Sequence, residues 1–171
     1  MAAARARGDE LAVWLAGVTA AQRAVKVRSI DVERALVGCE PPLTVAEVAR
    51  AVDAGRDLAA RAADEGVSVV VSAGGESQAA RSLVTGLAAD DGRPLRALRR
   101  LGTEEIAVLC GVALGAGERG LGCVCDGLGA LAGAAVATAI EPDLRPRLRA
   151  ASDHEQAAAL GIGSVDPRGL R

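Results

Sequence analysis

The chain has 171 residues and is 50% hydrophobic, with no Phe or Tyr and a single Trp. This length supports one domain with a real core, and a core of Ala, Val, Leu and Gly buries less apolar area per residue than one with aromatics. A formal net charge of −2 gives no electrostatic reason to expect nucleic-acid binding.

The first part of the chain predicts a helix and then a strand. Residues 9–23 have the spacing of an amphipathic helix, with four apolar side chains on one face: Leu11, Trp14, Leu15 and Val18. This apolar run is too short to span a bilayer, and acidic residues precede it, so neither a membrane segment nor a secretion signal is expected. Residues 25–32 alternate in polarity like a half-exposed strand.

A long helix, a buried strand and a second helix are predicted next. Thr44-Val45-Ala46-Glu47 is a capping box, which begins a helix that runs to about Glu65. The valine-rich run 67–72 is typical of a strand that is buried on both faces of a parallel sheet. Ala73-Gly74-Gly75 makes a turn, and residues 76–88 form the second helix.

The stretch 95–140 is the most informative part, because it reads as helix, strand and helix. Residues 103–114 follow an N-cap candidate, residues 121–125 form a short apolar strand that ends at Asp126-Gly127, and residues 129–140 form a helix of small residues. Beyond Pro142 the chain becomes rich in arginine, and only a short helix near 154–160 is predicted there.

The alternation of strands and helices predicts a single Rossmann-like α/β domain over residues 1–171. Right-handed crossovers would connect a small parallel sheet that is flanked by helices. The core would span 25–140, between the N-terminal helix 9–23 and a C-terminal tail, 141–171, that contains the short helix.

The turn after the valine strand is the first candidate site. Gly74 and Gly75 would expose backbone N–H groups that can cradle an anion at the start of a helix, beside Glu76 and Ser77. A plain strand-to-helix turn explains the same residues equally well. Glu76 would also compete with a bound phosphate for that helix end, because a carboxylate interacts favourably with the helix dipole.

Two acidic residues form the second candidate. Asp126, followed by Gly127, lies at the carboxyl end of a strand, where α/β sheets bind ligands, and its carboxylate could hold ribose hydroxyls. Alternatively, Asp126-Gly127 ends the strand and caps the next helix. Glu105 could point toward the same crevice, or it could interact only with the dipole of its own helix.

The cysteines and arginines favour structural roles. Cys39, Cys110, Cys123 and Cys125 lack a paired CxxC spacing, which suits small buried side chains in a reducing cytoplasm. A metal at Cys123-x-Cys125 would need further ligands, and His154 is the single histidine, so no metal is expected. No cofactor is expected either. The arginine clusters at 96–100 and 145–149 could hold phosphate, but solvated helix faces or ends are favoured.

Two segments resemble the nicotinate-nucleotide:dimethylbenzimidazole phosphoribosyltransferases of cobalamin lower-ligand assembly, in a shortened and divergent form. The family's Gly-Gly-x-Glu-Ile-Ala helix start matches Gly102-Thr103-Glu104-Glu105-Ile106-Ala107, and its Leu-Asp-Gly-Phe strand end matches Cys125-Asp126-Gly127-Leu128. In the family's Gly-Glu-Met-Gly-Ile-Gly-Asn-Thr-Thr stretch, the last glycine falls on Gly75, and Asn-Thr-Thr falls on Glu76-Ser77-Gln78. The resemblance covers roughly residues 25–165.

The resemblance implies a truncated phosphoribosyltransferase core that acts as a cytoplasmic homodimer away from membranes. The implied reaction moves phosphoribose from nicotinate mononucleotide to 5,6-dimethylbenzimidazole and gives α-ribazole phosphate. The implied substrate-binding residues are Gly74, Gly75, Glu76, Ser77, Glu105, Asp126 and Gly127.

The same resemblance leaves the activity of this chain open. In the family a carboxylate of a late Gly-Glu-Gly-Ser/Thr-Gly-Ala motif deprotonates the acceptor, and this chain ends at Arg171 just before such a motif would begin. Impaired catalysis is therefore expected, and no catalytic residue is assigned. The alternatives are a non-catalytic nucleotide-binding or dimerisation relative and a decayed fragment.

Overall fold

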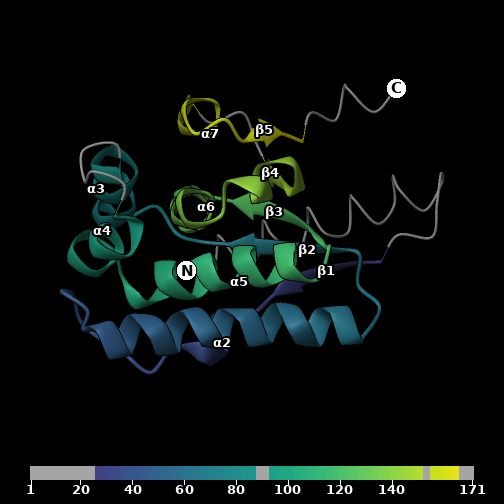
Figure 1. Cartoon of the computed structure of the whole chain (residues 1–171), viewed down its shortest axis with the longest axis horizontal. Coiled ribbons are helices and arrows are strands. Elements are labelled where there is room, and N and C mark those ends of the chain that lie inside the picture. The colour runs from purple at the N-terminus through teal and green to yellow at the C-terminus, as the bar shows by residue number, and fades with distance from the viewer. Residues whose placement is uncertain (1–25, 88–92, 152–154, 166–171) are drawn as a thin grey trace.

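A computed structural model describes residues 26–87, 93–151 and 155–165 (Figure 1). The strands are β1 (Val27–Ile30), β2 (Val69–Ala73), β3 (Gly122–Asp126), β4 (Leu148–Ala150) and β5 (Gly163–Ser164). The α-helices are α2 (Val45–Asp64), α3 (Gln78–Leu87), α4 (Pro94–Leu101), α5 (Glu104–Glu118), α6 (Leu128–Ile140) and α7 (Glu155–Ala159), and the 3-10 helices are η1 (Glu33–Ala35) and η2 (Pro142–Arg147). The helix predicted at 9–23 and His154 lie outside the described residues.

The strands form one parallel sheet, as predicted. Within the described ranges it has five strands in the order β1-β2-β3-β4-β5, each parallel to its neighbour. The register places Val71 of β2 opposite Ser29 of β1 and Val124 of β3. The predicted capping box also forms, since Thr44 Oγ1 accepts the Glu47 N–H and the Glu47 carboxylate accepts the Thr44 N–H. The α/β class with a small, helix-flanked parallel sheet is confirmed.

Helix α4 and the strands β4 and β5 were not predicted from the sequence. Helix α4 begins at Pro94, which the sequence analysis did not place in a helix, and a missing N–H costs nothing in the first turn. Strands β4 and β5 extend the sheet into the arginine-rich region. These two strands have 3 and 2 residues, so they are too short to show a period of two and are defined by pairing with neighbours distant in sequence.

The sequential strand order determines which face of the sheet carries the helices. Right-handed crossovers that always advance in one direction place their helices on the same face. The main hydrophobic cluster accordingly joins Val70, Cys123 and Leu148 to the helices, whereas Val71 and Val124 belong to a separate cluster on the opposite face. None of the described helices is long and apolar enough to cross a membrane.

Close helix packing compensates for the lack of Phe and Tyr. Helix α5 lies between α2 and α6 (Figure 1). A Cβ atom on Gly55 of α2 would lie 2.1 Å from the carbonyl oxygen of Val108, and one on Gly111 of α5 would lie 2.0 Å from that of Val52. The two backbones are therefore in direct contact. Most residues of α5 are buried, and its first turn lies at the carboxyl ends of the strands.

Candidate functional site

Two glycine turns lie against each other at the carboxyl ends of β2 and β3. The Gly74 N–H donates to the carbonyl of Asp126 over 2.9 Å, and the Gly129 N–H donates to the carbonyl of Gly75 over 3.0 Å. The register continues to this point, with Ala73 opposite Asp126. The structure thus brings the two predicted turns into direct contact.

Close approach explains two of the predicted site glycines. A Cβ atom on Gly74 would lie 2.5 Å from the backbone nitrogen of Ala130. Gly127 has a φ of +82°, in the left-handed region that favours glycine, and a Cβ atom there would lie 2.2 Å from the carbonyl oxygen of Gly74. Gly75 differs, because its Cβ position meets nothing within 4 Å. Gly74 and Gly127 are needed for packing, and Gly75 is the turn residue with open space beside it.

Glu105 reaches this turn from the first turn of α5. Its Oε1 accepts the Gly75 N–H over 3.3 Å, so the side chain reaches the glycine turn and does more than interact with the dipole of its helix. Burial raises the pKa of this carboxyl, the bond from Gly75 lowers it in part, and the charge of Glu33 raises it further. A half-buried carboxyl with a raised pKa that bonds to a glycine turn is a candidate proton acceptor.

Glu76 and Ser77 are occupied within their own helix region. Ser77 is exposed, and its Oγ accepts the Ala80 N–H over 3.1 Å, which caps the start of α3. Glu76 is exposed and forms an ion pair with Arg81 at 3.2 Å. The contacts of Ser77 and Glu76 are those of an ordinary strand-to-helix turn.

Asp126 occupies the last position of β3 and is 6% exposed. The N-cap of α6 is the next residue, Gly127, and no side-chain hydrogen bond caps this described helix end. The structure therefore places the Asp126 carboxylate in a buried position beside the two glycine turns.

Sequence analysis missed the neighbouring residue Glu104. Its buried carboxylate accepts hydrogen bonds from three backbone N–H groups of the segment 37–39 and from Arg50. Burial alone would raise the pKa of Glu104, but these donors outweigh it and hold that pKa below its usual value. The partners are 54 to 67 residues away in the sequence, so no local pattern could have identified them.

The cysteines behave as small buried side chains. All four are free thiols, and three are buried: Cys110, Cys123 and Cys125. Burial raises the pKa of Cys110 to about 12, which leaves its thiol protonated and unreactive. Among the described residues, no group of three or more His, Cys, Asp or Glu side chains is placed to hold a metal ion.

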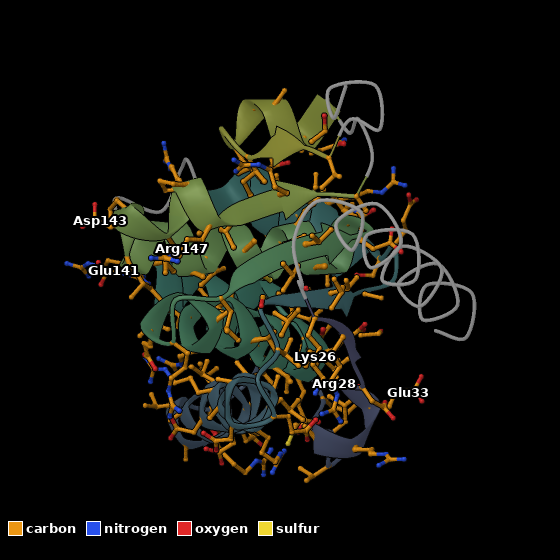
Figure 2. The ribbon with its side chains drawn as sticks, turned by 90° about the vertical axis from the view of Figure 1, so that its right-hand side faces the viewer. Lys26, Arg28, Glu33, Glu141, Asp143 and Arg147 are labelled. Atoms are coloured by element: carbon orange, nitrogen blue, oxygen red, sulfur yellow. The ribbon has the colours of Figure 1, made fainter. Side chains whose placement is uncertain are left out.

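The arginine clusters bond to backbone carbonyls at the ends of elements. Arg99 Nε donates to the carbonyl of Leu43, and Arg147 Nη1 donates to that of Gly120 over 2.8 Å. A hollow of about 380 Å³ that includes Glu141, Asp143 and Arg147 lies at η2, and another of about 340 Å³ that includes Arg28 lies beside β1, far from the first (Figure 2). Neither hollow includes the glycine turns.

Comparison with known proteins bears on the same region. A sequence profile described as phosphoribosyltransferase matches residues 77–162, about half of the chain. The crystal structure of CobT from Thermus thermophilus superposes with a TM-score of 0.68 at 22% identity, covering 95% of this chain and 69% of that one. The nicotinate-nucleotide-dimethylbenzimidazole phosphoribosyltransferase of the same organism gives a TM-score of 0.65 at 20% identity, covering 96% and 86%. A search of curated protein sequences finds no match.

Proposed function

Because this chain belongs to the phosphoribosyltransferase family, we propose that it takes part in phosphoribosyl transfer from nicotinate mononucleotide to 5,6-dimethylbenzimidazole. The acceptor base loses a proton from one ring nitrogen, and the other ring nitrogen attacks C1 of the ribose. The bond from C1 to nicotinate breaks, and the products are α-ribazole phosphate, nicotinate and a proton. The likeness in fold to two Thermus phosphoribosyltransferase structures supports this proposal.

The bond between Glu105 and the Gly75 N–H is the observation that carries the proposal. It places a carboxylate of raised pKa at the turn after β2, where the nucleotide would lie. Such a group can take the proton of the acceptor base, provided that the two come within hydrogen-bond reach. The ribose phosphate would occupy the open space beside Gly75, and the Asp126 carboxylate would face the ribose hydroxyls.

The direct test is turnover by the purified chain. With nicotinate mononucleotide and dimethylbenzimidazole together, free nicotinate and α-ribazole phosphate are expected to appear in equal amounts. Omitting the acceptor base is the control, because nicotinate released without it reports hydrolysis. No product above the uncatalysed background would contradict transfer by this chain.

A nucleotide-binding protein without transfer activity is the second candidate. Packing alone accounts for Gly74 and Gly127, so these two glycines do not require a reaction. Calorimetry with nicotinate mononucleotide separates the two candidates. Binding without turnover would support this second candidate, and neither binding nor turnover would contradict both.

We also propose that the chain forms a homodimer in the cytoplasm. The four free thiols suit a reducing compartment. An apolar groove of about 270 Å³ includes three exposed hydrophobic side chains from three helices: Val45, Leu95 and Ile140. Asp53 and Arg99 also line the groove, so two copies could meet there with opposite charges facing each other.

Leu95→Glu is expected to convert the dimer to a monomer, because it places a charge in the apolar groove. Light scattering after size-exclusion chromatography measures the mass of the particle. Arg96→Glu is the control, because Arg96 lies beside Leu95 in α4 but does not line the groove. A dimer that persists in Leu95→Glu would contradict this interface.

A further inference from the structure

The carboxylate of Glu104 has four hydrogen-bond donors around it. Oε1 accepts the Val37 N–H over 3.1 Å and an Arg50 N–H over 2.9 Å. Oε2 accepts the Gly38 and Cys39 N–H groups over 2.8 and 3.0 Å. The side chain is 6% exposed, so these donors replace water almost completely. Bonds of this kind to an ionised acceptor are about twice as strong as bonds between neutral groups.

The backbone of 37–39 has the form of an anion site. Successive N–H groups that point at one position make a concavity for negative charge. Gly38 has a φ of +88°, and a Cβ atom there would meet nothing within 4 Å. The glycine therefore serves the backbone conformation that turns its N–H inward, and it does not serve close packing. Arg50 adds a full positive charge at the edge of this concavity.

The same carboxylate joins two segments at the carboxyl ends of the strands. Glu104 and Glu105 are consecutive in the first turn of α5, but they face different neighbours. Glu104 holds the segment after β1, whereas Glu105 holds the turn after β2 through Gly75. Fixing the first carboxylate therefore fixes the helix end that carries the second.

We propose that residues 37–39 and Arg50 form an anion-binding site, that the chain fills it with its own Glu104, and that this contact positions Glu105 against Gly75. Glu104 is a positioning residue, because it does not contact the Gly75 turn itself and acts on that turn only through Glu105. The kinetic consequence rests on the proposed function, whereas the anion site and the placement of Glu105 can be measured without turnover.

Glu104→Ala tests the anion site, because it removes the carboxylate and leaves the four donors. Added sodium formate is expected to enter the vacated position and to raise the melting temperature of this variant by about 3 °C more than that of the unmodified protein. Sodium chloride at the same ionic strength is the control. Equal responses to formate in the two proteins would overturn the anion site.

Amide hydrogen exchange at Gly75 tests the positioning role. In Glu104→Ala the Gly75 amide is expected to exchange at least about tenfold faster, because Glu105 no longer accepts its bond, and formate should slow it again. Gly75 exchange that is unchanged in the folded variant would overturn the positioning role. With an active protein, kcat should fall more than KM for nicotinate mononucleotide changes, and formate should restore part of kcat. If the unmodified protein shows no turnover, the proposed function is refuted. The formate response and the Gly75 exchange rate would still test the anion site and the positioning role.

Arg50→Met keeps the proposal testable if Glu104→Ala does not fold. This variant removes one donor and leaves Glu104 in place with three. Gly75 exchange should accelerate by a smaller factor, and formate should have no specific effect, since the position is still filled. No change in Gly75 exchange, or a formate response as large as that expected for Glu104→Ala, would count against the proposal.

Discussion

Replacing Glu105 with glutamine is expected to lower kcat for phosphoribosyl transfer by about 100- to 1000-fold. Glutamine has nearly the same size and can still accept the Gly75 N–H, so the turn should keep its geometry. The amide cannot take a proton from the acceptor base, so the loss falls on the chemical step. KM for nicotinate mononucleotide should change little. Steady-state kinetics with both substrates varied measures these two effects separately.

The pH dependence of kcat in the unmodified protein gives an independent check. Burial raises the pKa of Glu105 in the folded protein, so kcat should fall as the pH drops through that raised value, above the range of an ordinary carboxyl. The ionised form is disfavoured in the folded state, so ionisation costs stability above the raised pKa. This cost disappears as the pH falls below the ordinary value of the unfolded chain. Glu105→Gln should therefore melt at the same or a higher temperature near neutral pH.

Glu118→Gln is the matched control for Glu105→Gln. Glu118 lies at the other end of α5 and pairs with Arg56 at 3.1 Å, and its side chain is 52% exposed. This variant should retain the turnover and the pH profile of the unmodified protein, because exposed ion pairs contribute little. Full activity in Glu105→Gln, or equal losses in both variants, would contradict a role of Glu105 as base.

Gly127→Ala is expected to lower the free energy of unfolding by about 2–4 kcal/mol, the sum of two effects. At a φ of +82° an alanine is strained, and its Cβ atom would lie 2.2 Å from the carbonyl oxygen of Gly74. Because that atom belongs to the backbone of the neighbouring turn, no side-chain rotation can relieve the contact. The variant must move the two turns apart. Urea unfolding followed by circular dichroism measures the loss.

Gly75→Ala is the matched control in the facing turn. Its Cβ atom would meet nothing within 4 Å, and the position is outside the left-handed region, so the free energy of unfolding should change by less than about 0.5 kcal/mol. Ligand binding is the property that this variant should affect, since the new methyl group projects into the open space at the Gly75 turn. Equal unfolding midpoints for the two alanine variants would show that the turns do not pack as described.

The elements with strong local patterns could be predicted from the sequence. Helix α2 has a capping box and a repeating apolar face, and β2 is a run of valines, so short-range preferences and burial agree at both. Strand β4 has no such signal. Leu148-Arg149-Ala150 becomes a strand only because its backbone pairs with β3, which precedes it by more than twenty residues.

The site shows the same division within two adjacent residues. The resemblance to phosphoribosyltransferases singled out Glu105, and the structure places this side chain at the Gly75 turn. Glu104 is chemically identical and one position earlier, yet its side chain is buried against the backbone of the segment 37–39. Consecutive residues on a helix point about 100° apart, so the surroundings of the helix decide which carboxylate meets which partner.

By itself, the sequence determined the α/β class, the order of the main strands and helices, and the family, because periodicity, capping and turn residues act over a few neighbouring positions. Only the tertiary structure decided that Gly74 and Gly127 face each other, that Glu104 is a buried internal anion, and that the sheet continues through β4 and β5. These features depend on contacts between residues that are distant along the chain, and such contacts are fixed when the helices and the sheet pack together.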